Sequence, residues 1–191
     1  MSDTAATDLT GHLLIAMPDL GDPRFAGGVV FLCRHGADGA MGVLINKPLP
    51  DIGFADMLDQ LEIAHEPPVP PVPLCYGGPM DQRRGFVLHS AEYRGRAGDA
   101  LEVGDRFTMA ATLDVVEDLA RGNGPEHALM ALGYAGWAPA QLEGEIAENA
   151  WLTCEATPEL VFDKTMETKW EAALASLGIH PLMLSSTAGR A

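Results

Sequence analysis

The chain has 191 residues, of which 47% are hydrophobic and 20% are charged. These proportions are close to those of average globular proteins, so they exclude a disordered chain, a collagen-like chain and a small disulfide scaffold. The 27 acidic residues outnumber the 12 basic ones, and the formal net charge at pH 7 is −15. Because an acidic surface repels phosphate backbones, we expect no direct binding to nucleic acid.

The first third of the chain is predicted to form short strands joined by turns. Residues 1–10 predict a flexible polar tail. Apolar runs that end at glycine, proline or asparagine predict strands at residues 12–17, 28–33 and 40–45. The last two runs are separated by a short turn, which predicts a hairpin. Apolar residues at helical spacing predict a short helix near residues 54–61.

A proline-rich segment follows this helix. Five of the seven residues from Pro67 to Pro73 are proline. Such a sequence favours the extended polyproline II conformation, which is stiff and has no internal hydrogen bonds. Because neither flanking segment has an apolar core of its own, we interpret residues 67–73 as a surface connector within one domain. A ligand for an aromatic groove of another protein is the alternative.

The remainder of the chain alternates between predicted strands and helices. Strands are predicted at residues 72–76, 85–88, 101–110, 128–134 and 151–154, the third of them split at Gly104. Helices are predicted from Thr112 or Asp114 onward, over residues 139–149, after Thr157 and around residues 168–177. Thr157 fits an N-terminal cap, with Pro158 in the first turn of its helix. Two pairs fit capping boxes, Asp114 with Glu117 and Thr168 with Glu171. This order predicts an α+β fold with a single domain over residues 11–185 and a C-terminal tail at 186–191.

The three cysteines are Cys33, Cys75 and Cys154. Their number is odd, their spacing is wide and two of them lie in apolar runs, so we interpret them as small core residues in a reducing compartment. The N-terminus lacks the basic start and apolar centre of a secretion signal, and the longest uncharged run contains glycine, proline and histidine. We therefore expect a cytoplasmic protein that does not insert into a membrane.

The sequence signatures of common catalytic sites are missing. The chain has no glycine-rich phosphate loop, no GxSxG and no HExxH. Ser90 directly follows His89, but neighbours in a strand point to opposite faces, so these two do not form a nucleophile and its base. Without a Cys/His array, we expect no metal site, and we expect no cofactor.

Three polar residues follow apolar strands: His35, Asn46 and His89. In such places Asn and His either hydrogen-bond to the backbone or line a functional site. If the three converge, they form a pocket for acid–base chemistry or for an anion. Gly77 and Gly78 then form either a tight turn or a place where a ligand approaches the backbone, and Arg83 and Arg84 supply positive charge.

The predicted helix at residues 139–149 offers a different kind of site. Glu145, Glu148 and Asn149 share one of its faces, and Glu143 points in a nearly opposite direction to Glu145. We interpret the shared face as a solvated stripe or as the surface that contacts a partner protein. The three tryptophans are interpreted as core anchors: Trp137, Trp151 and Trp170.

Several strings of the sequence resemble the YqgE/AlgH family of bacterial proteins. They are LTGHLLIAMP at 9–18, GAMGVLINKP at 39–48, YGGPM at 76–80, FVLHS at 86–90, GYAGW at 133–137, QLEGEI at 141–146 and NAWL at 149–152. The resemblance covers roughly residues 9–180, with Lys47 where arginine is frequent and Met80 where valine is common. It implies an α+β fold in which helices flank a bifurcated or barrel-like sheet. It brings no catalytic residue set, and some members are called transcriptional regulators.

These observations favour a non-catalytic binding or regulatory protein that acts through contacts with a partner protein. Its support is the missing catalytic signature and the acidic surface, and the resemblance adds a role in transcription. The alternative is an enzyme or sensor for an acidic or phosphorylated small molecule, with His35 and His89 in its pocket.

Overall fold

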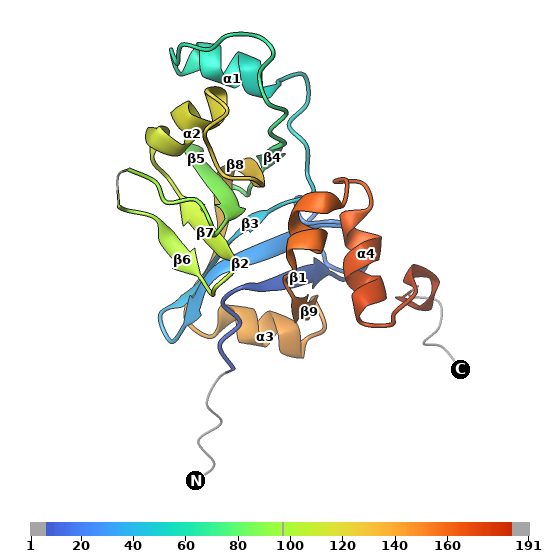
Figure 1. Ribbon diagram of the computed structural model, residues 1–191. Helices are drawn as coiled ribbons and strands as arrows, with labels where there is room; N and C mark the ends of the chain where they lie inside the picture. Colours follow the sequence, from blue (N-terminus) through green and yellow to red (C-terminus); the bar gives the residue numbers. More distant parts are fainter. Residues whose placement is uncertain (1–6, 97, 185–191) are drawn as a thin grey trace, which may run out of the picture.

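The computed structural model describes residues 7–96 and 98–184. Within these residues it confirms the α+β class. The strands are β1 (His12–Ala16), β2 (Val29–Gly36), β3 (Gly39–Leu44), β4 (Leu74–Tyr76), β5 (Met80–Ser90), β6 (Leu101–Val103), β7 (Phe107–Ala110), β8 (Ala128–Trp137) and β9 (Trp151–Glu155). They form one curled sheet in the order β6-β7-β5-β8-β3-β2-β1-β9, with β4 paired to β8 beside this path (Figure 1). The β4–β8 pair is parallel and all other pairs are antiparallel.

Helices cover the sheet from several sides. They are α1 (Phe54–Gln60), α2 (Leu113–Ala120), α3 (Gln141–Ala147), the π-helix η1 (Glu159–Asp163), α4 (Lys169–Ser176) and the 3-10 helix η2 (Pro181–Leu184). Helices α1 and α2 lie together at one end of the molecule, α3 lies at the opposite end, and α4 packs against β1 and β2 (Figure 1). Among the residues described, none of the helices is long and apolar enough to cross a membrane.

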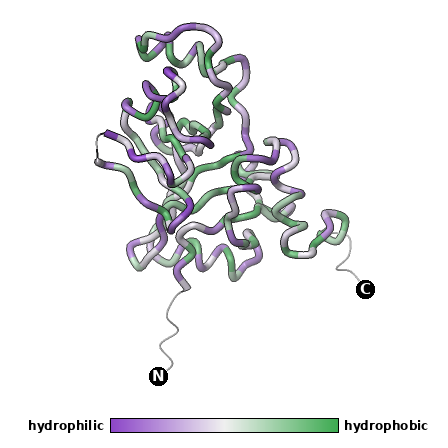
Figure 2. The backbone as a smooth tube through the Cα atoms, in the orientation of Figure 1, coloured by the Kyte–Doolittle hydropathy of each residue, from purple (hydrophilic) through white to green (hydrophobic). Residues whose placement is uncertain are grey.

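Residues 29–33 of strand β2 are buried on both faces, as their uninterrupted apolar run predicts. Val29 and Phe31 belong to the larger core cluster, against which α4 packs. Val30 and Leu32 belong to a second cluster on the other face, together with Leu142 of α3. A strand between two cores needs an apolar residue at every position, which explains why polar residues do not alternate here. Figure 2 shows the central strands as predominantly hydrophobic.

The sheet curls until its two edges approach each other, which gives a half-barrel and confirms the barrel-like expectation. Strand β6, at one edge, contacts β2, which lies third from the other edge. Arg106, in the turn after β6, forms an ion pair with Glu155 at the end of β9. The curl therefore encloses the larger core cluster between the strands and α4.

Two boundaries differ from the predictions for a local reason. Strand β5 begins at Met80 rather than near residue 85, because Met80 already pairs with Tyr134 of β8 before the register shifts ahead of Gly85. Helix α3 begins at Gln141 rather than Pro139, because Ala140 has a φ of 62° and so cannot continue a right-handed helix.

The two predicted capping boxes are wrong, although a third predicted cap is confirmed. The carboxylate of Asp114 accepts the backbone N–H of Arg96 at 2.6 Å instead of capping α2. The hydroxyl of Thr168 donates to the Thr165 carbonyl oxygen at 3.2 Å. At the start of η1, by contrast, the Thr157 hydroxyl accepts a backbone N–H at 3.2 Å, as an N-terminal cap does.

Candidate functional site

His35 holds the N-terminal segment and α3 against β2. Its buried ring accepts the backbone N–H of Leu9 at Nδ1, at 3.1 Å. Since Nδ1 accepts, the ring proton lies on Nε2, which is 3.1 Å from a carboxylate oxygen of Glu143. Both ring nitrogens are therefore used within the fold, which supports the backbone-bonding interpretation of this residue.

Of the predicted tails, residues 1–6 and 186–191 lie outside the described residues.

Asn46 fixes the entry to β2. Its side-chain oxygen accepts the backbone N–H of Val29 at 2.8 Å, and its side-chain nitrogen donates to the Gly27 carbonyl oxygen at 2.8 Å. One amide therefore satisfies a donor and an acceptor on the neighbouring chain. Asn46 acts as a turn anchor, one of the two roles that the sequence suggests.

His89 lies on a different part of the sheet from His35. Strands β3 and β8 separate its strand, β5, from β2. The ring donates from Nδ1 to the Ser90 carbonyl oxygen at 2.8 Å and lines a small cavity of about 120 Å³ beside Tyr93. A common pocket would need His35 and His89 to converge, and none of the cavities described here is lined by both.

Burial gives His89 a measurable effect on stability. It holds the pKa of this imidazole below its ordinary value, although the Ser90 carbonyl and the carboxylates of Glu92 and Asp114 act in the opposite direction. The unfolded chain then binds more protons than the folded chain as the pH falls below about 6.5, so stability is lost on acidification. We expect His89→Gln to flatten the dependence of the unfolding free energy on pH between about 7 and 5.

Urea unfolding at several pH values measures this slope, and His180→Gln, at an exposed histidine, is the matched control. The control is expected to keep the native slope. A His89→Gln protein with the slope of the native protein would show that this imidazole is not held neutral by the fold.

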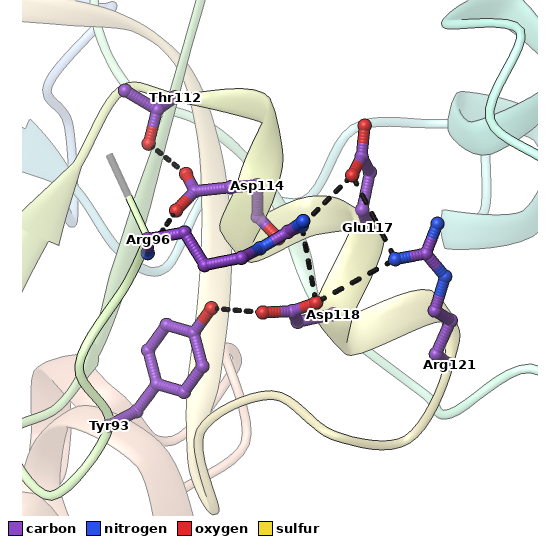
Figure 3. A network of polar contacts seen from close by, with 7 residues as sticks. All are labelled: Tyr93, Arg96, Thr112, Asp114, Glu117, Asp118 and Arg121. Carbon is purple, nitrogen blue, oxygen red and sulfur yellow. Dashed lines mark hydrogen bonds and ion pairs between the residues drawn. The ribbon is translucent and has the colours of Figure 1, made fainter.

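Both arginines of the loop after β5, Arg94 and Arg96, are already paired with acidic residues, and Figure 3 shows the contacts of Arg96. Arg96 contacts Glu117 and Asp118 at 2.9 and 3.3 Å, and Arg94 pairs with Glu102. The Tyr93 hydroxyl donates to Asp118 at 2.7 Å. This network ties the loop after β5 to α2, so its charges hold the fold together and are not free for an anion.

Arg83 and Arg84 differ from these arginines. Both are exposed, and neither takes part in an ion pair within residues 7–96 and 98–184. Arg84 lines a cavity of about 280 Å³, with its guanidinium 5.2 Å from the centre of the Phe86 ring. Arg83 does not line this cavity, so the structure separates two residues that the sequence treats as equivalent.

Gly77 and Gly78 allow two backbones to approach, and neither lines the cavities described here. The N–H of Gly77 donates to the Leu132 carbonyl oxygen at 2.7 Å, and its own carbonyl accepts the N–H of Leu44 at 2.8 Å. Gly77 thus bridges β8 and β3 at the point where the sheet divides. A Cβ atom on Gly77 would overlap the carbonyl oxygen of Gly133. The backbone that approaches Gly77 closely is therefore that of strand β8, where the sequence left open a ligand.

Glu145 is not part of a solvated stripe, which corrects that interpretation. Its Oε2 accepts the indole N–H groups of Trp137 at 2.9 Å and Trp151 at 2.8 Å. Its Oε1 accepts the side-chain N–H of Gln141 at 2.9 Å. Glu148 and Asn149, the two remaining residues of the predicted face, are exposed. The carboxylate of Glu145 therefore anchors two core tryptophans from α3.

These tryptophans form one side of a cavity of about 200 Å³, which we call the aromatic cleft. Its lining residues are Leu20, Asp22, Arg24, Phe25, Pro79, Met80, Ala135, Gly136, Trp137, Gln141, Glu145 and Trp151. The ring of Trp151 lies 5.6 Å from that of Phe25 and 6.0 Å from that of Trp137, both edge to face. Arg24, at the rim, is paired with Asp22 at 2.6 Å. The cleft is thus a rigid aromatic site with one internal carboxylate.

Sequence reasoning did not select the cleft as a site, although a signal for it was present. Four of the strings that carry the family resemblance each contribute to its lining: 76–80, 133–137, 141–146 and 149–152. The tryptophans were correctly interpreted as core anchors, since Trp137 and Trp151 are buried and Trp170 donates to the Ala16 carbonyl oxygen at 2.9 Å. Side chains that anchor the core also line an open cavity here.

Comparisons with known proteins agree with this resemblance. A family model described as AlgH-like matches residues 13–182. A UPF0301 protein of Jannaschia sp. (strain CCS1) is 59% identical over 184 residues, which is 96% of each chain, and one of Ruegeria pomeroyi is 54% identical over 96% of this chain and 100% of its own. The solution structure of AlgH from Pseudomonas aeruginosa has 41% identity, covers 100% of both chains and superposes with a TM-score of 0.77.

A protein of Corynebacterium diphtheriae with 20% identity has the same fold, with a TM-score of 0.71 over 92% of this chain and 91% of its own. The model match spans nearly all of the described domain, and the relatives match along almost their whole length. The chain belongs to the AlgH-like family.

Proposed function

We propose that this protein is a non-catalytic binding protein that docks a partner protein through its aromatic cleft. The observation that carries the proposal is the rigid pair of indoles beside an exposed methionine. Trp137 and Trp151 are fixed by Glu145, and Met80 at the cleft is 44% exposed. Interfaces are enriched in aromatic residues, methionine and arginine, and a site held in place before binding loses little entropy on binding.

The chemistry of the lining supports binding over catalysis. The cleft residues include no histidine, cysteine, serine, threonine or lysine, so they offer no nucleophile beside a general base. The carboxylate of Glu145 is occupied by three donors. A group held in this way positions its neighbours and is poorly placed to move a proton.

The charge of the surroundings suggests the kind of partner. Residues 97–163 carry thirteen acidic residues against Arg106 and Arg121, and helix α3 has no basic residue. An apolar or aromatic anchor residue flanked by basic side chains would complement the cleft and the acidic helix α3 beside it. We place any effect on transcription in the partner protein, because a net charge of −15 disfavours contact with DNA. We place the protein in the cytoplasm, with its three buried cysteines reduced.

A matched pair of variants tests the proposal. Met80→Asp puts a charge at the cleft, and Leu113→Asp puts one on α2, where the leucine is 53% exposed. Helix α2 lies at the opposite end of the molecule from α3, which contributes to the cleft (Figure 1). Both sites are exposed, so both proteins are expected to fold. Tagged proteins expressed at the native level are purified from cells, and the co-purifying proteins are quantified by mass spectrometry.

We expect proteins retained by the native chain and by Leu113→Asp to fall about tenfold or more with Met80→Asp. Equal retention by the two variants would contradict a role for the cleft in docking.

A further inference from the structure

A second cavity lies inside the curl of the sheet, against the larger core cluster, and shares no residue with the aromatic cleft. Its volume is about 280 Å³. Side chains from six strands line it: Cys33, Met41, Phe86, Leu101, Met109 and Tyr134. We call it the sheet cavity. Convergence of six strands gives it walls that are fixed by the sheet itself.

The inner wall of the sheet cavity carries no charge. The Phe86 ring is almost fully buried and meets the Tyr134 ring edge to face, with centroids 5.9 Å apart. Burial raises the pKa of the Cys33 thiol to about 12, so this sulfur is uncharged at neutral pH. The remaining wall groups are hydrocarbon or thioether. Such a surface favours an apolar group over water.

The mouth of the sheet cavity carries positive charge that the fold leaves unpaired. The guanidinium of Arg84 lies over Phe86, and no ion pair holds it within the described residues. Arg34 stands directly opposite Met41 in the β2–β3 register, so both side chains lie on the same face of the sheet. Arg34 is exposed and likewise takes part in no ion pair within residues 7–96 and 98–184.

One acidic residue, Asp99, also lines the cavity. Arg84 is the one arginine in the lining, and in a chain with 27 acidic residues it has no ion pair within the described residues, so it calls for a ligand that supplies the missing negative charge. The uncharged wall and the unpaired arginine at the mouth together indicate an amphipathic ligand.

We propose that the sheet cavity binds a small amphipathic anion, with a hydrocarbon chain against Phe86 and a carboxylate at Arg84. This site is independent of the partner-binding cleft. It gives the protein a second activity, the sensing or carriage of a monomeric aliphatic carboxylic acid. His35 and His89 do not line the cavity, so the acidic ligand is recognised by arginine and an apolar wall.

Decanoate is the probe, and decanol is its uncharged counterpart. Isothermal titration calorimetry, at concentrations where the probe is monomeric, is expected to give one saturable site for decanoate. Arg84→Gln should raise its dissociation constant by about tenfold or more, because a carboxylate then loses its charged partner. The matched control, Arg83→Gln, changes a neighbouring exposed arginine outside the cavity and should alter binding by less than about twofold. Decanol should bind the native protein and Arg84→Gln equally.

Two further variants separate the charge from the cavity. Asp99→Asn removes the one like charge at the site and is expected to tighten decanoate binding. Ala111 is exposed and lines the cavity, so Ala111→Trp is expected to fill it and abolish binding without disturbing the core. The folded state of each variant is checked by its thermal unfolding before titration.

Several results would overturn the proposal. They are the lack of saturable decanoate binding, equal losses in Arg83→Gln and Arg84→Gln, and undiminished binding by Ala111→Trp. Because the protein has a net charge of −15, we expect an anionic membrane to repel it. Cosedimentation with phosphatidylglycerol vesicles would instead mean that the site binds a membrane lipid, which contradicts a monomeric ligand.

Discussion

Gly77→Ala is expected to prevent the chain from reaching its native fold. The added Cβ would overlap the Gly133 carbonyl oxygen and lie 2.9 Å from the Ala131 side chain. Neither backbone can retreat, because Gly77 hydrogen-bonds to Leu132 on one side and Leu44 on the other. We expect a loss of more than about 4 kcal/mol in the free energy of unfolding, which is a large share of the stability of a domain.

Circular dichroism and urea unfolding measure the effect of this substitution. The control is Gly144→Ala on α3, where nothing lies within 4 Å of an added Cβ. It is expected to stabilise the protein by about 0.5–1 kcal/mol, because alanine is the better helix former. A Gly77→Ala protein that unfolds at the native urea concentration would show that β3 and β8 do not need this close approach.

Glu145→Ala is expected to destabilise the protein by about 2–4 kcal/mol, because it leaves the indole N–H groups of two buried tryptophans without their acceptor. The same variant should loosen the aromatic cleft, whose walls those rings form. Glu148→Ala, at an exposed residue one turn further along, should stay within about 0.5 kcal/mol of the native protein.

The indole N–H resonances in NMR spectra give a readout specific to this anchor. Trp137 and Trp151 donate to Glu145, whereas Trp170 donates to the Ala16 carbonyl oxygen. In Glu145→Ala we expect the first two resonances to shift and the third to stay in place. Three unchanged resonances would mean that Glu145 does not hold the rings.

Features set by neighbouring residues could be predicted from the sequence. The apolar runs around residues 28–45 gave the β2–β3 hairpin, and helical spacing gave α1, α2 and α4 near their observed positions. Thr157 before Pro158 gave a correct cap. In these places the residues that decide the conformation lie within a few positions of one another, so the local pattern carries the information.

Features set by distant residues could not be predicted. Helix α3 shows the contrast: its spacing correctly separates Glu143 from Glu145, but not what each one contacts. Glu143 pairs with His35, 108 positions earlier, and Glu145 binds tryptophans on two different strands. Asp114 was expected to cap its own helix, but its carboxylate accepts the backbone N–H of Arg96 instead. Tertiary contacts override local preference at these positions.

The candidate site shows the same division. The polar residues at strand ends were correctly recognised as special, and His35 and Asn46 turned out to bind backbone groups. Whether they converge with His89 depends on strand order, which a single sequence does not specify, and β3 and β8 separate the strands of the two histidines. The aromatic cleft could not be predicted, because buried tryptophans usually indicate a core and not the wall of a binding site.

Site-specific photo-cross-linking tests the central claim, docking through the aromatic cleft, most directly. A photoreactive amino acid replaces Met80 in one protein and Leu113 in another, and both are activated in living cells of the native host. We expect an adduct of one defined mass from position 80, the loss of that adduct when Glu145→Ala loosens the cleft, and no such adduct from position 113. The same adducts from both positions, or none from position 80, would contradict docking through the cleft.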